Sequence, residues 1–532
     1  MRPSQFTPTL VYHVIIVCLG ALQFGYHLSE LNAPEVYISC QIRVDQNFFR
    51  SQELVDCIRM SPNQIGLVNS IFSVGGFLSA TFAGRLADKI GRRGVTMINC
   101  ISYIIGPAIM SVSTNFYILM LGRFVSGLGS GASLIVIPMY LNEISPAAMS
   151  GMIGAMCQEF VNIGILLAQV FGIFFSDFTK WRIILSIGGM LGLLNLVLIP
   201  LCVESPKWLT LRNRLHDARV ALIALRGLGS GPEAEVELMA IDDLIDSWRE
   251  KPDLKAVVSA GSSSESTLSE AVSDDDSVQN ISPEQIVAEI GPQSDSLSAI
   301  LSTEEADTLN LVDSESPHDF HKISYKEFLA SPTYRRPMIA VIGILTAQQF
   351  CGINTMIFYG VTILRVLFPT AAVLVNVLIS LLNCIVNLVV APFVDRVGRK
   401  PLLLISIGGM SMSSFLLAFG ILKNIMVLSA IAATIFVAFF SVGLGPIPFL
   451  VIPELTEASS VGVATSVGFT CNWISIFIVG YLFPVLNNAI GGYVFFLLSG
   501  IAACYFVFTI KFLPETKGKA TFEEVWGTPL VI

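Results

Sequence analysis

Twelve long apolar stretches decide what this chain can fold into. Each has about 20 residues, the length at which an α-helix crosses the roughly 30 Å hydrocarbon core of a bilayer. Charged residues make up 13% of the 532 positions and apolar residues 53%, whereas soluble proteins carry about 25% charged residues. The sequence therefore predicts an all-α membrane protein with twelve transmembrane helices. They are expected near residues 10–31, 64–84, 95–113, 117–140, 152–175, 182–202, 337–361, 368–393, 401–421, 425–452, 463–485 and 491–513.

Three charged motifs recur in the two halves of the chain. GRLADKIGRR follows the second stretch and PFVDRVGRKP follows the eighth. NEISP and PELTE follow the fourth and tenth, and VESPKW and LPETKG follow the sixth and twelfth. This recurrence indicates two six-helix repeats of one duplicated fold. The repeat pairs Asp88 with Asp395, Arg92 with Arg399, Arg93 with Lys400, Glu143 with Glu454, and Glu204 with Glu515.

The paired charges predict a gate at one end of the helices. A transporter that opens alternately to the two sides must hold its halves together on the closed side, and ion pairs between helix ends can form and break there. Gly91 and Gly398 permit tight turns that direct the neighbouring arginines at helix C-termini. The simpler alternative is that these basic clusters only set the orientation in the membrane. Matching motifs in both halves favour the gate.

The remaining chain divides by composition. Lys and Arg are more frequent in the segments on one side of the predicted spans, the side that also holds both termini. This excess predicts that both termini lie in the cytosol. The net charge of −9 comes mostly from one loop and does not indicate a nucleic-acid partner. A Ser-rich acidic insert is expected to be disordered, either as a linker or as a segment phosphorylated by a kinase. The predicted parts are an N-terminal half at 1–202, cytosolic amphipathic helices at 203–250, the acidic insert at 251–318, a C-terminal half at 319–513 and a cytosolic tail at 514–532.

The motifs taken in order resemble those of a known family. FGYHLSELNAP, GRLADKIGRR, GRFVSGLGSG, YLNEISP, VESPKW, QQFCGIN, VDRVGRKP, GPIPFLVIPE, FTCNW and PETKG are similar to blocks of the sugar porter family, within the major facilitator superfamily. The resemblance is closest to facilitative glucose transporters and fungal-type hexose transporters. It implies transport of a monosaccharide across the lipid bilayer by alternating access, with no enzyme activity, cofactor or metal. It leaves plasma and vacuolar membranes as alternatives.

Side-chain amides inside the spans predict the sugar site. Amides donate to and accept from hydroxyl groups without adding a charge that would hold the sugar too tightly for release. Gln158 and Asn162 share one face of the fifth span, and a bend at Gly352 is expected to bring the amides of the seventh span together. The resemblance adds Asn383 of the eighth span and the aromatic side chains of Phe449 and Trp473. The predicted substrate-binding residues are Gln158, Asn162, Gln348, Gln349, Asn354, Asn383, Phe449 and Trp473.

Five positions depart from the glucose-transporter pattern. Ser441 replaces an acidic residue, Phe449 a Trp and Ile476 an Asn. These departures leave open which hexose, related sugar or polyol is carried. Ser150 and Val461 replace arginines of the inner gate, which predicts a more populated inward-open state. In the first outer loop, a disulfide between Cys40 and Cys57 is one of two open alternatives.

The coupling mode depends on titratable groups inside the spans. His27 occupies a position that resembles the acidic site of proton-coupled sugar porters, and it is expected to face Arg123 of the fourth span. A neutral imidazole beside that cation would act as a hydrogen bonder, which slightly favours facilitated diffusion. Glu30, placed near the outer surface, and Glu159, beside Gln158, keep a proton-coupled symporter as the alternative. A nutrient sensor that does not transport is the alternative from another class.

Overall fold

The computed structural model describes residues 7–41, 57–146, 149–227, 328, 331–457, 460–519 and 522–527. The helices discussed below belong to one compact unit, formed by residues up to Asp246 and from Ile323 onwards. The predicted acidic insert, the later part of the predicted cytosolic helices and the side chains of Ser150 and Asp395 lie outside the described residues. The domain boundaries therefore stay a prediction.

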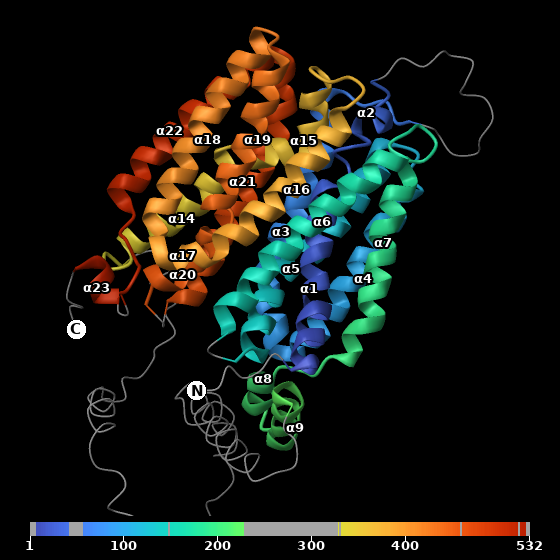
Figure 1. The fold of residues 1–532 in the computed structure, drawn as a ribbon. Helices are drawn as coiled ribbons and strands as arrows, with labels where there is room; N and C mark the ends of the chain where they lie inside the picture. The colour runs from blue at the N-terminus through green and yellow to red at the C-terminus, as the bar shows by residue number, and fades with distance from the viewer. Residues whose placement is uncertain are drawn as a thin grey trace, which may run out of the picture. The chain divides into compact units, whose positions relative to one another are not determined.

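The N-terminal half contains six long helices (Figure 1). Short helices follow the first and the sixth of them. Their bounds are α1 Pro8–Ser29, α2 Glu35–Ile38, α3 Pro62–Ile90, α4 Arg92–Ser111, α5 Phe116–Ile144, α6 Ser150–Phe175, α7 Trp181–Leu198 with the 3-10 turn η2 Ile199–Leu201, α8 Pro206–Leu211 and α9 Leu215–Arg226. Helices α8 and α9 confirm the predicted short helices over the described part of 203–250.

The C-terminal half repeats this arrangement with two of its helices interrupted. Their bounds are α14 Arg335–Phe350, α15 Ile353–Arg365, α16 Ala372–Val390, η5 Ala391–Phe393, α17 Val394–Val397, α18 Arg399–Leu422, α19 Met426–Val442, α20 Ile447–Leu455, α21 Val461–Ile490, η6 Gly491–Tyr493, α22 Val494–Phe512 and α23 Phe522–Trp526.

Eleven helical segments of the described chain are long and apolar enough to cross a membrane. The last of them, Val461–Phe512, has 52 residues, more than twice the roughly 20 that one span needs. The 3-10 turn η6 divides it into α21 and α22. It therefore supplies two spans, and the predicted fold of twelve transmembrane helices is confirmed.

The seventh span is broken where the sequence predicts a bend. Gly352 lies between α14 and α15 with φ of +99°, a conformation that costs glycine little and other residues more. The tenth span is interrupted in the same way between α19 and α20, over residues 443–446. Breaks of this kind turn side chains and backbone carbonyls toward the space between the halves.

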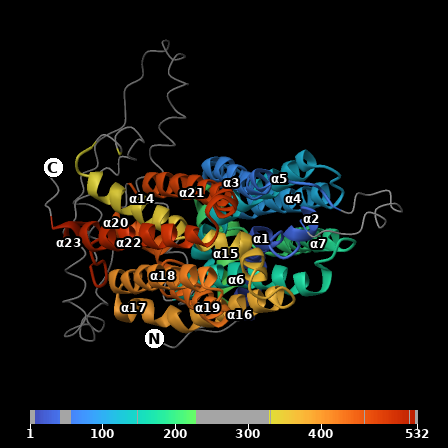
Figure 2. The same ribbon diagram turned by 90° about the horizontal axis from the view of Figure 1, so that it is seen from above.

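The most extensive contacts between the halves are those of α3 with α21 and of α6 with α16 (Figure 2). Glycine allows the close approach of the first pair. A Cβ atom on Gly66 would lie 2.7 Å from the carbonyl oxygen of Tyr481, and one on Gly76 would lie 2.5 Å from the Trp473 ring. The second pair is joined by polar side chains, which belong to the candidate site.

The two ends of the helices differ in their structure. At the end that carries α2, here called the α2 end, a disulfide joins Cys40 and Cys57, whose Cα atoms are 5.5 Å apart. At the opposite end, here called the α8 end, Trp208 Nε1 donates to the carbonyl oxygen of Asp88 over 2.9 Å. Helix α8 thereby caps the C-terminal end of α3. The disulfide left open by the sequence is present.

Candidate functional site

A cavity lies between the two halves. None of the described residues that line it is charged. Its polar lining consists of Ser380 and nine side-chain amides, namely Gln158, Asn162, Gln169, Gln348, Gln349, Asn354, Asn376, Asn383 and Asn472. Seven of the eight predicted substrate-binding residues line it, the aromatic Phe449 among them.

The break at Gly352 gathers the amides of the seventh span into a chain. Asn354 Nδ2 donates to Gln349 Oε1 over 2.6 Å, and Gln349 Nε2 donates to Gln348 Oε1 over 3.2 Å. Gln348 Nε2 in turn donates over 2.8 Å to the carbonyl oxygen of Leu444, in the break of the tenth span. A straight helix would spread these amides over different faces. The two broken helices therefore orient one another.

Asn162 connects the amides of the two halves. Its Oδ1 accepts from Gln158 Nε2 at 3.4 Å and from Asn383 Nδ2 at 3.2 Å. Ser441 Oγ donates to the Oδ1 of Asn383. Ser441 thus holds Asn383 at a position where the glucose-transporter pattern has a carboxylate.

Two further bonds extend this contact between α6 and α16. Asn387 Nδ2 donates to Glu159 Oε2 over 2.9 Å, and Ser380 Oγ donates to Gln169 Oε1 over 2.6 Å. Glu159 is therefore partnered by a neutral amide of the other half. Both of its neighbours on α6, Asn162 and Gln158, carry no charge that could neutralise it.

Trp473 lies outside the cavity lining, unlike the other predicted contacts. It is 1% exposed and meets the rings of Phe24 and Phe72 edge-on, with both centroids 6.3 Å away. The lining takes Asn472 and Ile476 from α21 instead. A sugar contact by Trp473 is not made in this conformation, because α21 turns that face toward α3.

Asn472 is a site residue that the sequence analysis missed. Its Nδ2 donates to Gln348 Oε1 over 3.0 Å and to the carbonyl oxygen of Leu345 over 3.0 Å. The signal was present, because Asn472 is the amide of the FTCNW motif and lies within a span. An amide inside a span, next to the aromatic residue of a family motif, indicates a binding position as strongly as Gln158 does.

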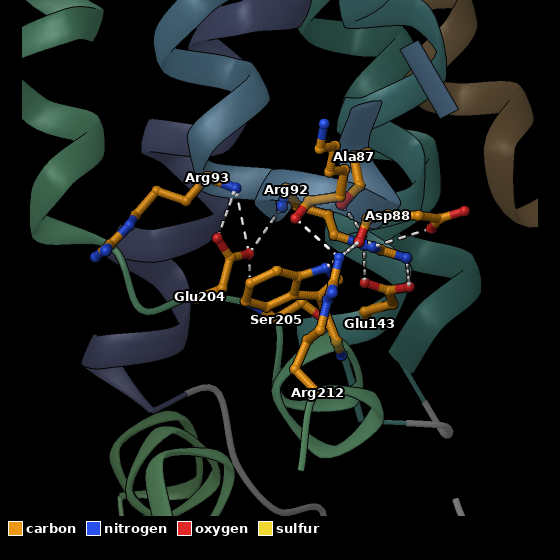
Figure 3. A network of polar contacts seen from close by, with 10 residues as sticks. Ala87, Asp88, Arg92, Arg93, Glu143, Glu204, Ser205 and Arg212 are labelled. Carbon is orange, nitrogen blue, oxygen red and sulfur yellow. Dashed lines mark hydrogen bonds and ion pairs between the residues drawn. The ribbon is translucent and has the colours of Figure 1, made fainter. Parts of the chain in front are cut away.

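At the α8 end, Glu204 and Arg92 organise the charged motifs of the N-terminal half (Figure 3). Glu204 Oε1 accepts from the backbone N–H groups of Arg92 at 2.9 Å and Arg93 at 3.2 Å, at the N-terminus of α4. Arg92 binds Glu143 through Nε at 2.7 Å and Nη2 at 2.8 Å, and Nη1 donates over 3.0 Å to the carbonyl oxygen of Ala87. Carboxylate at a helix N-terminus and arginine at a C-terminus both match the helix dipoles.

The remaining charged residues of this motif lie toward the surface. Asp88 contacts Arg92 at 3.3 Å but is 75% exposed. Arg93 Nη1 donates over 3.1 Å to the carbonyl oxygen of Cys202. These contacts attach the segment after α7 to the start of α4.

The C-terminal half repeats these contacts. Glu515 accepts from the backbone N–H groups of Arg399 at 3.0 Å and Lys400 at 3.1 Å, and Arg399 binds Glu454 at 2.8 Å. Lys400 Nζ donates over 2.9 Å to the carbonyl oxygen of Ile510. The predicted aim of the arginines at helix C-termini is confirmed, because Arg399 Nη1 donates to the carbonyl oxygen of Val394 over 3.4 Å.

These ion pairs correct one part of the gate prediction. Arg92 with Glu143 joins α4 to α5, and Arg399 with Glu454 joins α18 to α20, so each pair lies within one half. The sequence analysis expected pairs between the halves. A duplicated motif places its own partners inside each repeat, and this geometry keeps each half rigid in the observed conformation.

We predict that Gly91→Ala destabilises the N-terminal half. Gly91 has φ of +89°, and a Cβ atom there would lie 2.3 Å from Glu204 Oε2. The backbone strain alone costs about 1–3 kcal/mol, and the clash displaces Glu204 from α4. The apparent melting temperature of purified protein measures the loss. Gly94→Ala is the matched control, because its nearest neighbour would lie 3.5 Å away; an equal effect of both variants would contradict the prediction.

Near the α2 end, three titratable residues form a fully buried triad. Glu30 Oε2 is 2.9 Å from His27 Nδ1, and Glu30 Oε1 accepts from Arg123 Nη1 at 3.1 Å. All three side chains are 0% exposed. The predicted proximity of His27 and Arg123 is confirmed, because Arg123 Nη1 also donates to the carbonyl oxygen of His27. The prediction that Glu30 lies near the outer surface is wrong, since Arg123 of α5 and the backbone at Gly188 of α7 lie against its carboxylate.

Asn32 joins the halves at the α2 end. Its Oδ1 accepts from the backbone N–H of Val361 at 2.9 Å, and its Nδ2 donates to the carbonyl oxygen of Met356 at 3.3 Å. Both partners belong to α15. This side chain therefore bonds the segment after α1 to the broken seventh span.

Comparison with known proteins identifies the family. The family model described as sugar (and other) transporter matches residues 13–261 and 291–526. The chain belongs to this sugar transporter family. The family and its solved structures are transporters, so the protein is not an enzyme.

The relatives match this chain almost end to end. A probable metabolite transport protein of Saccharomyces cerevisiae is 33% identical over 98% of this chain and 96% of that protein. The vacuolar protein sorting-associated protein 73 of the same yeast is 30% identical over 96% of this chain and 95% of that protein. Human facilitated glucose transporter member 4 is 28% identical over 98% of this chain and 91% of that protein.

Solved structures establish the fold of this chain. The xylose transporter XylE from E. coli, in a partially occluded inward-open conformation, superposes with a TM-score of 0.69 at 17% identity. The match covers 97% of this chain and 100% of that chain. The fold is that of the major facilitator superfamily.

Proposed function

We propose that this protein carries a neutral monosaccharide across a membrane by alternating access. The observation that carries the proposal is the cavity between the halves, lined by nine side-chain amides and by no charged residue. Amides match sugar hydroxyls in both donor and acceptor roles. Phe449, stacked on Phe469 with ring centroids 5.4 Å apart, offers an apolar face to a sugar ring.

Competition against uptake of a labelled hexose in proteoliposomes tests the substrate class. Neutral hexoses, pentoses and polyols are expected to compete, whereas the matching sugar acids and amino sugars are expected to compete at least tenfold less well. The reason is that a charged group would lose its hydration in a cavity without a counter-ion. Equal competition by neutral and charged sugars would contradict the proposal.

Proton symport is a second candidate because of where Glu30 lies. Facilitated diffusion, the other candidate, needs no titratable carboxylate beside Arg123. The Glu30 carboxylate lies between His27 and Arg123. Its Oε2 is 2.9 Å from His27 Nδ1, and its Oε1 is 3.1 Å from Arg123 Nη1. A proton on Glu30 would release Arg123 and so link protonation to conformation. Glu159 offers a second carboxylate, at the contact between the halves.

Net uptake with and without an imposed pH gradient separates the two modes. A facilitator shows the same flux in both cases, whereas a symporter accumulates sugar against its gradient. Loss of accumulation in Glu159→Gln alone would assign coupling to Glu159. Loss in the double variant Glu30→Gln/Arg123→Gln, with exchange of sugar retained, would assign it to the triad.

The proposed orientation places both termini and the α8 end in the cytosol. The support is the excess of Lys and Arg in the segments on that side. Two membranes fit, plasma and vacuolar, and the relatives' names include both a vacuolar sorting protein and a glucose transporter. Fluorescent tagging of the C-terminus with a pH-sensitive reporter tests the orientation; a lumenal or external signal would overturn it.

A further inference from the structure

We infer that Glu35 is a proton-binding site, distinct from the triad, and that its protonation favours the outward-closed conformation. The contact between the two halves at the α2 end is here called the outer gate. The inference rests on the alternating access and orientation proposed above. Glu35 opens the short helix α2, between the first span, Pro8–Ser29, and the second, Pro62–Ile90. It lies where the two halves meet at the α2 end.

The carboxyl group of Glu35 is buried with almost no polar partner. The residue is 6% exposed. Its Oε1 has one donor, Thr362 Oγ1 of α15, at a long 3.4 Å. Its Oε2 has no hydrogen-bond partner among the described residues. An ionised carboxylate in this position would be poorly solvated, whereas a protonated one fits it.

Among the described residues, the lining of the small cavity beside Glu35 offers no compensating charge. Apart from Glu35 itself, its lining consists of one amide and of apolar side chains: Asn69, Leu31, Ile38, Met60, Ile65, Val68 and Leu119. Burial accordingly raises the pKa of Glu35 to about 8, and the hydrogen bond from Thr362 lowers it only in part.

Other charged and titratable groups near this site contact residues other than Glu35. On α15, Arg365 lies over the ring of Tyr37, with 5.2 Å between its guanidinium carbon and the ring centroid. Tyr359, also on α15, donates to the carbonyl oxygen of Gly480 over 2.7 Å. Arg123 is held by Glu30 at 3.1 Å. None of these residues forms a hydrogen bond or an ion pair with Glu35 in the described part of the chain.

Opening of the outer gate changes the environment of Glu35. When α15 moves away from α2, water reaches the carboxyl group and its pKa returns toward the usual value of about 4.3. The closed state has the raised pKa, so it binds the extra proton. The advantage of the closed state is complete at acid external pH and is lost as pH rises through about 8. Between the two pKa values, the ratio of closed to open protein falls about tenfold per pH unit.

This proton does not cross the membrane. It enters from the outer side when the gate closes and returns to the same side when the gate opens. Glu35 therefore sets how the conformational equilibrium depends on external pH without driving accumulation of sugar. This separates its role from that of the triad.

Distances between spin labels at the outer ends of the two halves test the inference. Lys180→Cys and Lys423→Cys give exposed positions on the turns after α6 and α18. The half-exposed Cys471 and exposed Cys504 are replaced by Ser, because the other free cysteines are buried. Full-length protein in nanodiscs is measured at about pH 6 and about pH 8, where the open fraction relative to the closed fraction should rise by up to about 100-fold.

Three variants make the result specific. Glu35→Gln should stay outward-closed at both pH values, since an amide mimics the protonated acid. Thr362→Val should move the transition to higher pH, because the ionised form loses its donor. Asp177→Asn, which removes an exposed carboxylate on the turn after α6, should behave as wild type. A pH-independent wild type, or pH dependence that persists in Glu35→Gln, overturns the inference.

The same labels separate this inference from the proposed function. If sugar changes the distances and pH does not, only the role of Glu35 fails. If neither sugar nor pH changes them, alternating access fails as well.

Discussion

Glu30→Gln is expected to lower the unfolding free energy by about 3–5 kcal/mol, the cost of leaving a buried charge unpaired. The amide keeps the shape of the side chain but removes the counter-ion of Arg123, which is 0% exposed. Arg123 retains the ring of Phe72, 4.6 Å from its guanidinium carbon, and the carbonyl oxygen of His27. Neither of these carries a negative charge. The apparent melting temperature of detergent-purified protein should therefore fall steeply.

Two variants show whether the buried charge is the cause. Glu30→Gln/Arg123→Gln removes both charges and should recover most of the lost stability. Glu159→Gln changes a half-buried carboxylate that accepts a hydrogen bond from the neutral Asn387. It should lower the unfolding free energy far less than Glu30→Gln does. If Glu30→Gln melts like Glu159→Gln, the triad does not contribute the expected stability.

Gln348→Ala and Asn354→Ala are expected to reduce sugar uptake to near background. Each amide belongs to the chain that joins Gln348, Gln349 and Asn354 in the cavity. One truncation removes a proposed sugar contact and leaves a sugar hydroxyl unpaired in the bound state. A buried polar group without a partner costs about 1–3 kcal/mol, and 1.4 kcal/mol is a tenfold change in affinity. Uptake at low sugar concentration should fall roughly 10- to 100-fold.

Expression and melting temperature must stay near wild type for this result to report on the site. Asn195→Ala is the matched control, because Asn195 is also a buried amide but lies on α7, where it donates to Gln23 over 3.4 Å. Its uptake should stay close to wild type. Equal losses of folded protein in all three variants would favour a packing role for the amides.

The sequence predicted the fold well because each span is a local property. A run of apolar residues needs no partner to be recognised as a membrane helix, and the glycine at 352 marks a break by itself. The repeat of GRLADKIGRR and PFVDRVGRKP added the two-half architecture. Relations along one helix, such as Gln158 with Asn162, were equally accessible.

The misses concern relations between helices. Periodicity along α21 shows that Asn472 and Trp473 are neighbours but not which of them faces the cavity, because α3 packs on the other side. Glu30 follows the last residue of α1, and its burial depends on which residues of α5 and α7 lie against it. The ion pairs of Arg92 and Arg399 depended on which helix end lies nearest in three dimensions. Spacing along the chain does not show which residues of different helices lie next to each other.

Counterflow of labelled sugar in proteoliposomes tests the central claim most directly. Vesicles that contain wild-type protein are loaded with unlabelled hexose and diluted into a trace of the labelled sugar at equal pH on both sides. Alternating access predicts a transient accumulation of label above its equilibrium level, absent from empty vesicles and from Asn354→Ala vesicles but present with Asn195→Ala. Binding of the sugar without any such overshoot, in wild-type protein that is folded and inserted, would contradict transport and favour a sensor.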